Sequence, residues 1–146
     1  MTQQEKELLL KDLCARLLYG VKVFYHTDGW EDKNNTLSPQ KIDMMLHRSD
    51  VIIKPHLRPI SSMTDEEVEE IRILLNNSNC GRVVNKENFT KENFGVLWFT
   101  NMCPSECVGH TMMSIVIDYL NSIHVDYRGL IPMGLALEAT EGLYDV

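Results

Sequence analysis

The sequence predicts an α+β fold in which a small antiparallel sheet packs against three main helices. Three long stretches carry apolar residues at helical spacing, and three short stretches are rich in the β-branched or aromatic residues typical of strands. The helical stretches are residues 3–18, 64–76 and 104–123, and the strand-like stretches are residues 20–26, 50–58 and 95–100. Elements with one apolar face bury that face against one another, so this pattern favours antiparallel strands packed on helices.

The size and composition of the chain are those of one ordinary globular domain, residues 1–146. Its 146 residues fall within the ~100 to 200 of a typical single core. A content of 44% apolar and 24% charged residues shows no drift toward disorder or a fibrous repeat. We therefore expect a single packed core.

The first helix and the strand after it have clear boundaries. Leucines recur at helical spacing from Leu9 to Leu18, and Gly20 stands where helices commonly stop. The next stretch, "GVKVFYH", places two valines and a tyrosine at alternate positions, which is typical of a strand with one buried face. The following "TDGWEDKNN" is rich in turn formers, so we expect a loop there.

Capping residues mark two further helices. Ser38 and Pro39 suit the N-cap and first turn of a short helix, and Thr64 with Glu67 forms a capping box. Between these helices, "DVIIKPHLRPI" is β-branched, but its prolines cannot donate ladder hydrogen bonds, which favours an edge strand or an extended exit from the strand. Later in the chain, "DYRGLIPMGLALEA" predicts a loop followed by a short strand or a docking segment.

Charge and cysteine content limit the partners and the compartment. Fourteen Lys and Arg against 21 Asp and Glu give a net charge of −7, which argues against general nucleic-acid binding. No window approaches the ~20 apolar residues of a membrane span, and "MTQQEKELLLKDL" is acidic where a signal peptide is basic. We expect a cytoplasmic protein without membrane contact, in which the cysteines stay reduced.

Cys103, Cys107 and His110 form a cluster of metal-ligating residue types. At positions i, i+4 and i+7 of a helix their side chains share a face, and zinc is the cofactor that such ligands would hold. The spacing matches none of the common zinc patterns, so the alternative is that the cysteines simply pack and the histidine is solvated. A nucleophilic Cys103 is disfavoured, because His110 lies ~10 Å further along the helix.

Two groups of polar residues are candidate ligand-binding residues. Lys54, His56 and Arg58 alternate, so an extended strand would place them on one face that could hold a phosphate, with a solvated edge as the alternative. His124 and Arg128 lie just beyond a predicted helix end. The alternative for Arg128 is that it satisfies helix carbonyls or pairs with Asp126, two residues earlier. An exposed edge near Lys54 would also let the chain pair with a copy of itself as a homo-oligomer.

The common catalytic motifs do not occur in the sequence. It has no glycine-rich phosphate loop of the G-x-x-x-x-G-K type, no HExxH and no G-x-S-x-G elbow. The motifs leave the common enzyme classes unsupported without excluding them, and we expect a binding protein more than an enzyme.

Three stretches carry a resemblance to a known family. "LLLKDLCARLLYGVKV", "HLRPISSMTDEE" and "DYLNSIHVDYRGLIPMGLALEATEGLYDV" resemble a family of small uncharacterised proteins encoded in Bacteroidales phages, prophages and genomes. They cover under half of the chain, and residues 78–113, which include the cysteine and histidine cluster, depart from the family. The resemblance implies an origin in gut Bacteroidales or their phages, where small acidic proteins often inhibit host defence or sequester nucleotide signals.

The residues and the resemblance together give two hypotheses. The first is a non-enzymatic binding protein of phage or mobile-element origin, whose partner is a host protein or a small anionic, nucleotide-like ligand. The second is a small zinc-dependent or zinc-stabilised module built on Cys103, Cys107 and His110.

Overall fold

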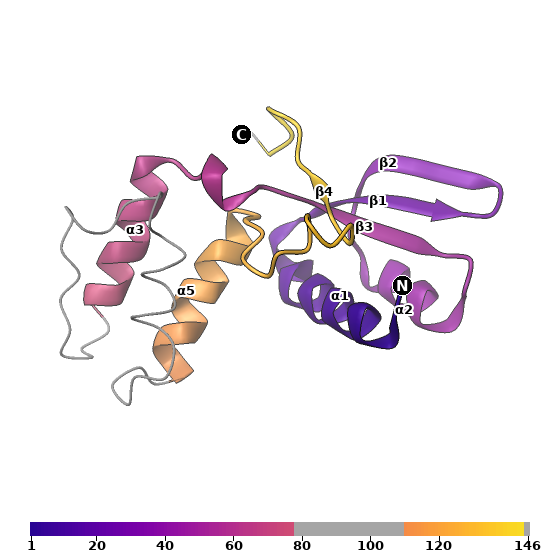
Figure 1. The fold of residues 1–146 in the computed structure, drawn as a ribbon, viewed down its shortest axis with the longest axis horizontal. Coiled ribbons are helices and arrows are strands. Elements are labelled where there is room, and N and C mark those ends of the chain that lie inside the picture. Colours follow the sequence, from indigo (N-terminus) through magenta and orange to yellow (C-terminus); the bar gives the residue numbers. More distant parts are fainter. Residues whose placement is uncertain (78–109, 145–146) are drawn as a thin grey trace. The chain divides into compact units, whose positions relative to one another are not determined.

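The computed structural model describes residues 1–77 and 110–144 (Figure 1). The chain forms two compact units. The larger unit comprises Met1–Pro59 and His124–Val146, and the smaller comprises Ile60–Ile123.

The larger unit is built on a four-stranded sheet in the order β2-β1-β3-β4. The strands are β1 (Lys22–Thr27), β2 (Trp30–Thr36), β3 (Ile52–Leu57) and β4 (Leu137–Glu138). The α+β prediction is confirmed, but the sheet is mixed and not wholly antiparallel. The first three strands pair antiparallel, whereas β4 runs parallel to β3.

Strand β2 corrects the expectation of a loop after the first strand. Asp28 and Gly29 make a two-residue turn between β1 and β2, and Gly29 has a φ of 86°, which suits glycine. All of β2 is exposed or only half-buried. An exposed strand needs no alternating apolar residues, so the polar sequence of β2 did not indicate a strand.

Two helices cover one face of this sheet (Figure 1). Helix α1 (Gln3–Arg16) begins with a capping box formed by Thr2 and Glu5, continues as the short helix η1 (Leu17–Tyr19), and stops at Gly20 with a φ of 68°. Helix α2 (Pro39–His47) is capped by Ser38, whose side chain accepts a hydrogen bond from the Lys41 N–H. The helix starts and the glycine stop agree with the sequence prediction.

The core of the larger unit lies between these helices and the odd-numbered residues of β1 and β3. The sheet contributes buried side chains that alternate with half-buried ones, and the helices contribute apolar residues at helical spacing. Its members include Leu9, Leu13, Val21, Val23, Tyr25, Ile42, Met45, Ile53 and Leu57.

The far end of β3 is enclosed on both sides. On one side, the Ala139 N–H donates to the Leu57 carbonyl at 2.8 Å, next to β4. On the other side, the Arg58 N–H donates to the His124 carbonyl and the Asp126 N–H donates to the Arg58 carbonyl, both at 2.8 Å. Residues 124–126 therefore extend the sheet beyond the start of β1.

The smaller unit contains the short helix η2 (Ile60–Ser62), α3 (Asp65–Asn76) and α5 (His110–Ser122). The predicted capping box is present, because the Glu67 N–H donates to Thr64 Oγ1 at 3.1 Å and the Thr64 N–H donates to Glu67 Oε1 at 2.9 Å. The expected strand at 95–100 and the start of the expected helix at 104 lie outside the described residues. Helix α5 agrees with the later part of that helix.

In the described ranges, no helix is long and apolar enough to span a membrane.

Candidate functional site

The face of the sheet opposite α1 and α2 carries basic and aromatic side chains. Lys54 and His56 alternate with buried residues along β3 and are half-buried themselves, and Arg58 continues the alternation. Neighbouring strand β1 presents Phe24 on the same face, directly across from Lys54. The structure therefore brings Lys54 and His56 together beside an aromatic ring.

A groove of about 460 Å³ opens on this face. Its walls come from strands β1, β2 and β3 and from the segment around β4. The lining residues are Phe24, Lys33, Asn34, His56, Leu137, Glu138 and Thr140. The groove thus combines one aromatic ring with an amide, a hydroxyl, an imidazole and charges of both signs.

Hydrogen bonding fixes the tautomer of His56 at the edge of this groove. Its Nε2 lies 2.7 Å from the carbonyl oxygen of Lys33. A carbonyl only accepts, so Nε2 carries the proton and donates, which leaves Nδ1 of the neutral ring as an acceptor. The same bond ties β3 to Lys33 across the strand between them.

Two of the cations on this face lack an opposing charge. Neither Lys33 nor Lys54 forms an ion pair within residues 1–77 and 110–144. Among the described residues that line the groove, the carboxylate is that of Glu138. An anion in the groove would therefore meet the Lys33 ammonium, which no carboxylate of the described residues pairs with, on a protein whose net charge is −7.

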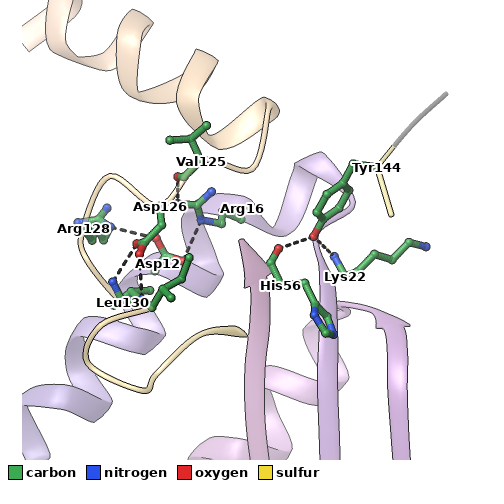
Figure 2. A network of polar contacts seen from close by, with 10 residues as sticks. Asp12, Arg16, Lys22, His56, Val125, Asp126, Arg128, Leu130 and Tyr144 are labelled. Carbon is green, nitrogen blue, oxygen red and sulfur yellow. Dashed lines mark hydrogen bonds and ion pairs between the residues drawn. The ribbon is translucent and has the colours of Figure 1, made fainter. Parts of the chain in front are cut away.

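Arg128 belongs to a buried polar network elsewhere in the larger unit (Figure 2). Its Nε donates to Asp12 Oδ1 at 3.2 Å, while the other carboxylate oxygen accepts from Arg16 Nε at 2.8 Å. Arg16 also donates to the Val125 carbonyl at 2.8 Å. The ring of Tyr127 contacts both guanidinium groups, at 5.3 Å from Arg16 and 4.9 Å from Arg128.

The pairing of Arg128 with Asp126, which the sequence left open as an alternative, is wrong. Both oxygens of Asp126 accept backbone bonds, from the Leu130 N–H at 2.9 Å and the Ile131 N–H at 2.8 Å (Figure 2). The carboxylate therefore holds a turn, and Arg128 pairs with Asp12 on helix α1 instead. Asp12 thereby links residue 128 to the first helix.

His124 is buried and lies away from the open face of the sheet. It is 8% exposed, has a φ of 62°, and its Nδ1 has no hydrogen-bond partner among the described residues. Its ring stacks on Tyr144 with centroids 3.7 Å apart. Burial, and then the charges of Arg16 and Arg58, lower the pKa of His124 to about 4, so the ring is neutral near pH 7.

Tyr144 joins this region to the groove. Its hydroxyl donates to the His56 carbonyl at 2.7 Å and accepts from the Lys22 N–H at 2.9 Å (Figure 2). Burial raises the pKa of Tyr144 to about 12, so the hydroxyl keeps its proton. Sequence reasoning missed Tyr144, because nothing local marks it. For Asp12 and Arg16 a signal existed, an i, i+4 ion pair beside the leucines of the first helix.

The cysteine and histidine cluster cannot be placed in the same way. Cys103 and Cys107 lie outside the described residues, and the side chain of His110, the first residue of α5, is also not described. Within the part of the chain that is described, no three His, Cys, Asp or Glu side chains gather as a metal site. Cys14 is an exposed free thiol.

No protein-family model, curated protein or solved structure matches this chain. Its function is therefore inferred from the chemistry of the groove.

Proposed function

We propose that this chain is a non-enzymatic binding protein of phage or mobile-element origin, which sequesters a small anionic, nucleotide-like ligand in the groove on the open face of its sheet. The observation that carries the proposal is that Phe24 lines the groove together with Lys33 and lies directly across from Lys54 on β3, two lysines without an opposing charge in the described ranges. An aromatic ring flanked by ammonium groups suits a ligand that has both a flat ring and a phosphate.

Each part of such a ligand has a counterpart in the groove. The base stacks on Phe24, which tolerates any base because every base has a π face. The phosphate lies against Lys33, and the carboxylate of Glu138 accepts from sugar hydroxyls instead of meeting the phosphate. The Nδ1 of His56 accepts from an exocyclic amine or a hydroxyl.

A counter-defence role fits this chemistry. Many host defences signal through nucleotides, and a protein that binds such a signal without changing it removes it by mass action. The resemblance of three stretches of the chain to Bacteroidales phage proteins supports this setting. A host protein as the partner is the competing outcome of the experiment.

The test is an NMR titration of the ¹⁵N-labelled full chain with AMP. Adenosine, which lacks the phosphate, and inorganic phosphate, which lacks the base, are titrated separately. We expect AMP to shift the amide signals of β1 and β3 and to bind more tightly than either fragment, because both subsites contribute. Lys33→Gln should weaken AMP binding, because Lys33 lines the groove, whereas Lys11→Gln at an exposed position of helix α1 makes the same charge change away from the groove and should not.

Absence of AMP-dependent shifts on β1 and β3 contradicts the nucleotide proposal and turns attention to a host protein. Equal weakening by both lysine variants also contradicts it, because general electrostatics alone would then explain binding.

A further inference from the structure

We propose that Tyr144 is a positioning residue of the groove: its hydroxyl sets the separation of β1 and β3 at His56 and holds the wall formed by residues 137–140. This inference rests on the proposed function, because it concerns the same site. Three observations carry it, namely the register of the sheet, the two bonds of the hydroxyl, and the path of the chain around the groove.

The register shows where Tyr144 enters the sheet. Strand β1 pairs with β3 at Phe24↔Lys54 and Val23↔Pro55. One further step along the same register would bring the Lys22 N–H opposite the His56 carbonyl. The Tyr144 hydroxyl lies between these two groups, accepting from the first at 2.9 Å and donating to the second at 2.7 Å.

The hydroxyl therefore replaces a direct ladder hydrogen bond with a two-step bridge. Beyond this point the strands separate, and residues 124–126 pair with Arg58 in place of β1. The ring of Tyr144 fills part of this space by stacking on His124. Tyr144 therefore lies at the point where the pairing partner on this side of β3 changes from β1 to residues 124–126.

The bridge acts directly on groove residues. His56 contributes its carbonyl to Tyr144 and its imidazole to the groove, where Nε2 donates to the Lys33 carbonyl. Moving the backbone at His56 would therefore move the ring and loosen Lys33. Lys22 is two residues from Phe24 on the same face of β1, so its backbone sets the aromatic side of the groove in the same way.

The opposite wall of the groove is held at both ends. Leu137 and Glu138 pair with β3, and the Ala139 N–H donates to the Leu57 carbonyl. Thr140 lies between this attachment and Tyr144 and lines the groove. Without the hydrogen bonds of the Tyr144 hydroxyl, the wall would be fixed only by the two-residue strand β4 and by the Ala139 to Leu57 hydrogen bond beside it.

The decisive variant is Tyr144→Phe. It keeps the ring that stacks on His124 and removes only the hydroxyl, so it should fold. The Lys22 N–H and the His56 carbonyl lose their bridge, and we expect AMP to bind about three- to tenfold more weakly, the equivalent of one hydrogen bond. The control is Tyr19→Phe, since the Tyr19 hydroxyl makes no hydrogen bond within the described ranges.

Binding is measured by NMR titration with AMP at a temperature at which circular dichroism shows both variants fully folded. The Lys22 amide shift reports loss of the bridge, and hydrogen exchange at Ala139 reports the attachment of the wall. A merely structural Tyr144 would lower the unfolding midpoint but leave the AMP affinity of the folded protein unchanged, and that result overturns the inference.

The two proposals fail in different ways. Wild-type protein that does not bind AMP overturns the proposed function, and the positioning role falls with it. Wild-type binding that Tyr144→Phe leaves intact overturns only the positioning role. Loss of affinity in Tyr144→Phe, with Tyr19→Phe unaffected and slower exchange at Ala139 in wild type than in the variant, supports it.

Discussion

Asp12 and Arg16 form an ion pair at 2.8 Å in which both side chains are fully buried. The second oxygen of the same carboxylate accepts from Arg128, so one buried anion serves two cations. A buried charge is tolerated only where it is paired, because its hydration is lost. The pair therefore holds helix α1 to residues 125–128 only as long as both partners are present.

Asp12→Ala should lower the free energy of unfolding by about 3 to 5 kcal/mol, because it leaves the Arg16 guanidinium buried without a counter-charge. Chemical denaturation measures this change. The paired variant Asp12→Leu with Arg16→Met should recover much of the loss, since it removes both fully buried charges and leaves only the partly exposed Arg128 without the Asp12 carboxylate. A single variant as stable as wild type would show that Arg16 reaches solvent when its partner is removed.

His124 should make stability fall as the pH drops from about 6.5 to about 4. The unfolded chain protonates this histidine near 6.5, whereas burial and two arginines lower the folded pKa to about 4. The unfolded state therefore binds more protons in that window, and a contribution present above it is lost on acidification. A shift of this size corresponds to roughly 3 kcal/mol.

The comparison variant for this titration is His124→Asn, because asparagine tolerates the positive φ of the site and does not titrate. Its stability should depend less on pH than that of wild type between 6.5 and 4. Asp50 does not confuse the result, since the Arg48 hydrogen bond lowers its pKa to about 2, outside the window. Parallel curves for the two proteins would mean that the pKa of His124 is the same in the folded and unfolded states.

Gly29→Ala should destabilise the β1–β2 hairpin by about 1 kcal/mol. A Cβ at this position would meet no atom within 4 Å, so the cost comes from the φ of 86° and not from a clash. Gly29→Asn, which accepts a positive φ, should cost less. Thermal unfolding followed by circular dichroism compares the two, and equal stabilities would contradict the backbone explanation.

Cys107→Ala combined with His110→Ala should leave stability and AMP binding nearly unchanged, because the proposed function assigns the ligand to Phe24, Lys33 and His56 and needs no metal at these two positions. Thermal unfolding with and without EDTA, and native mass spectrometry of the purified chain, test this. A zinc-sized mass increment, together with a large chelator-dependent loss of stability, would favour the zinc-stabilised module instead.

Local rules predicted the parts of the fold that depend on neighbours in sequence. The capping box of Thr64 and Glu67, the Ser38 cap and the Gly20 stop each involve residues within a few positions, so the sequence contains all of their partners. The alternation of Lys54 and His56 was likewise readable, because a strand has a period of two.

The rest depends on partners far away in the chain. Arg128 finds Asp12 at a separation of 116 residues, and Tyr144 finds His56 at a separation of 88. No spacing rule connects such pairs, so Asp126 was an equally good partner for Arg128 by sequence. Strand β2 was missed for another reason, since an exposed strand with polar residues resembles a loop, although the Asp28-Gly29 turn was a usable hairpin signal.

The bridge made by the Tyr144 hydroxyl also bears on how the protein is synthesised. The Lys22 N–H donates to the Tyr144 hydroxyl, which lies 122 residues later in the chain. A ribosome adds roughly 5 to 20 residues per second, so strands β1 to β3 leave the exit tunnel several seconds before that partner exists. During this interval the Lys22 N–H and the His56 carbonyl lack their bridge, and unpaired strand groups of this kind can pair with another chain.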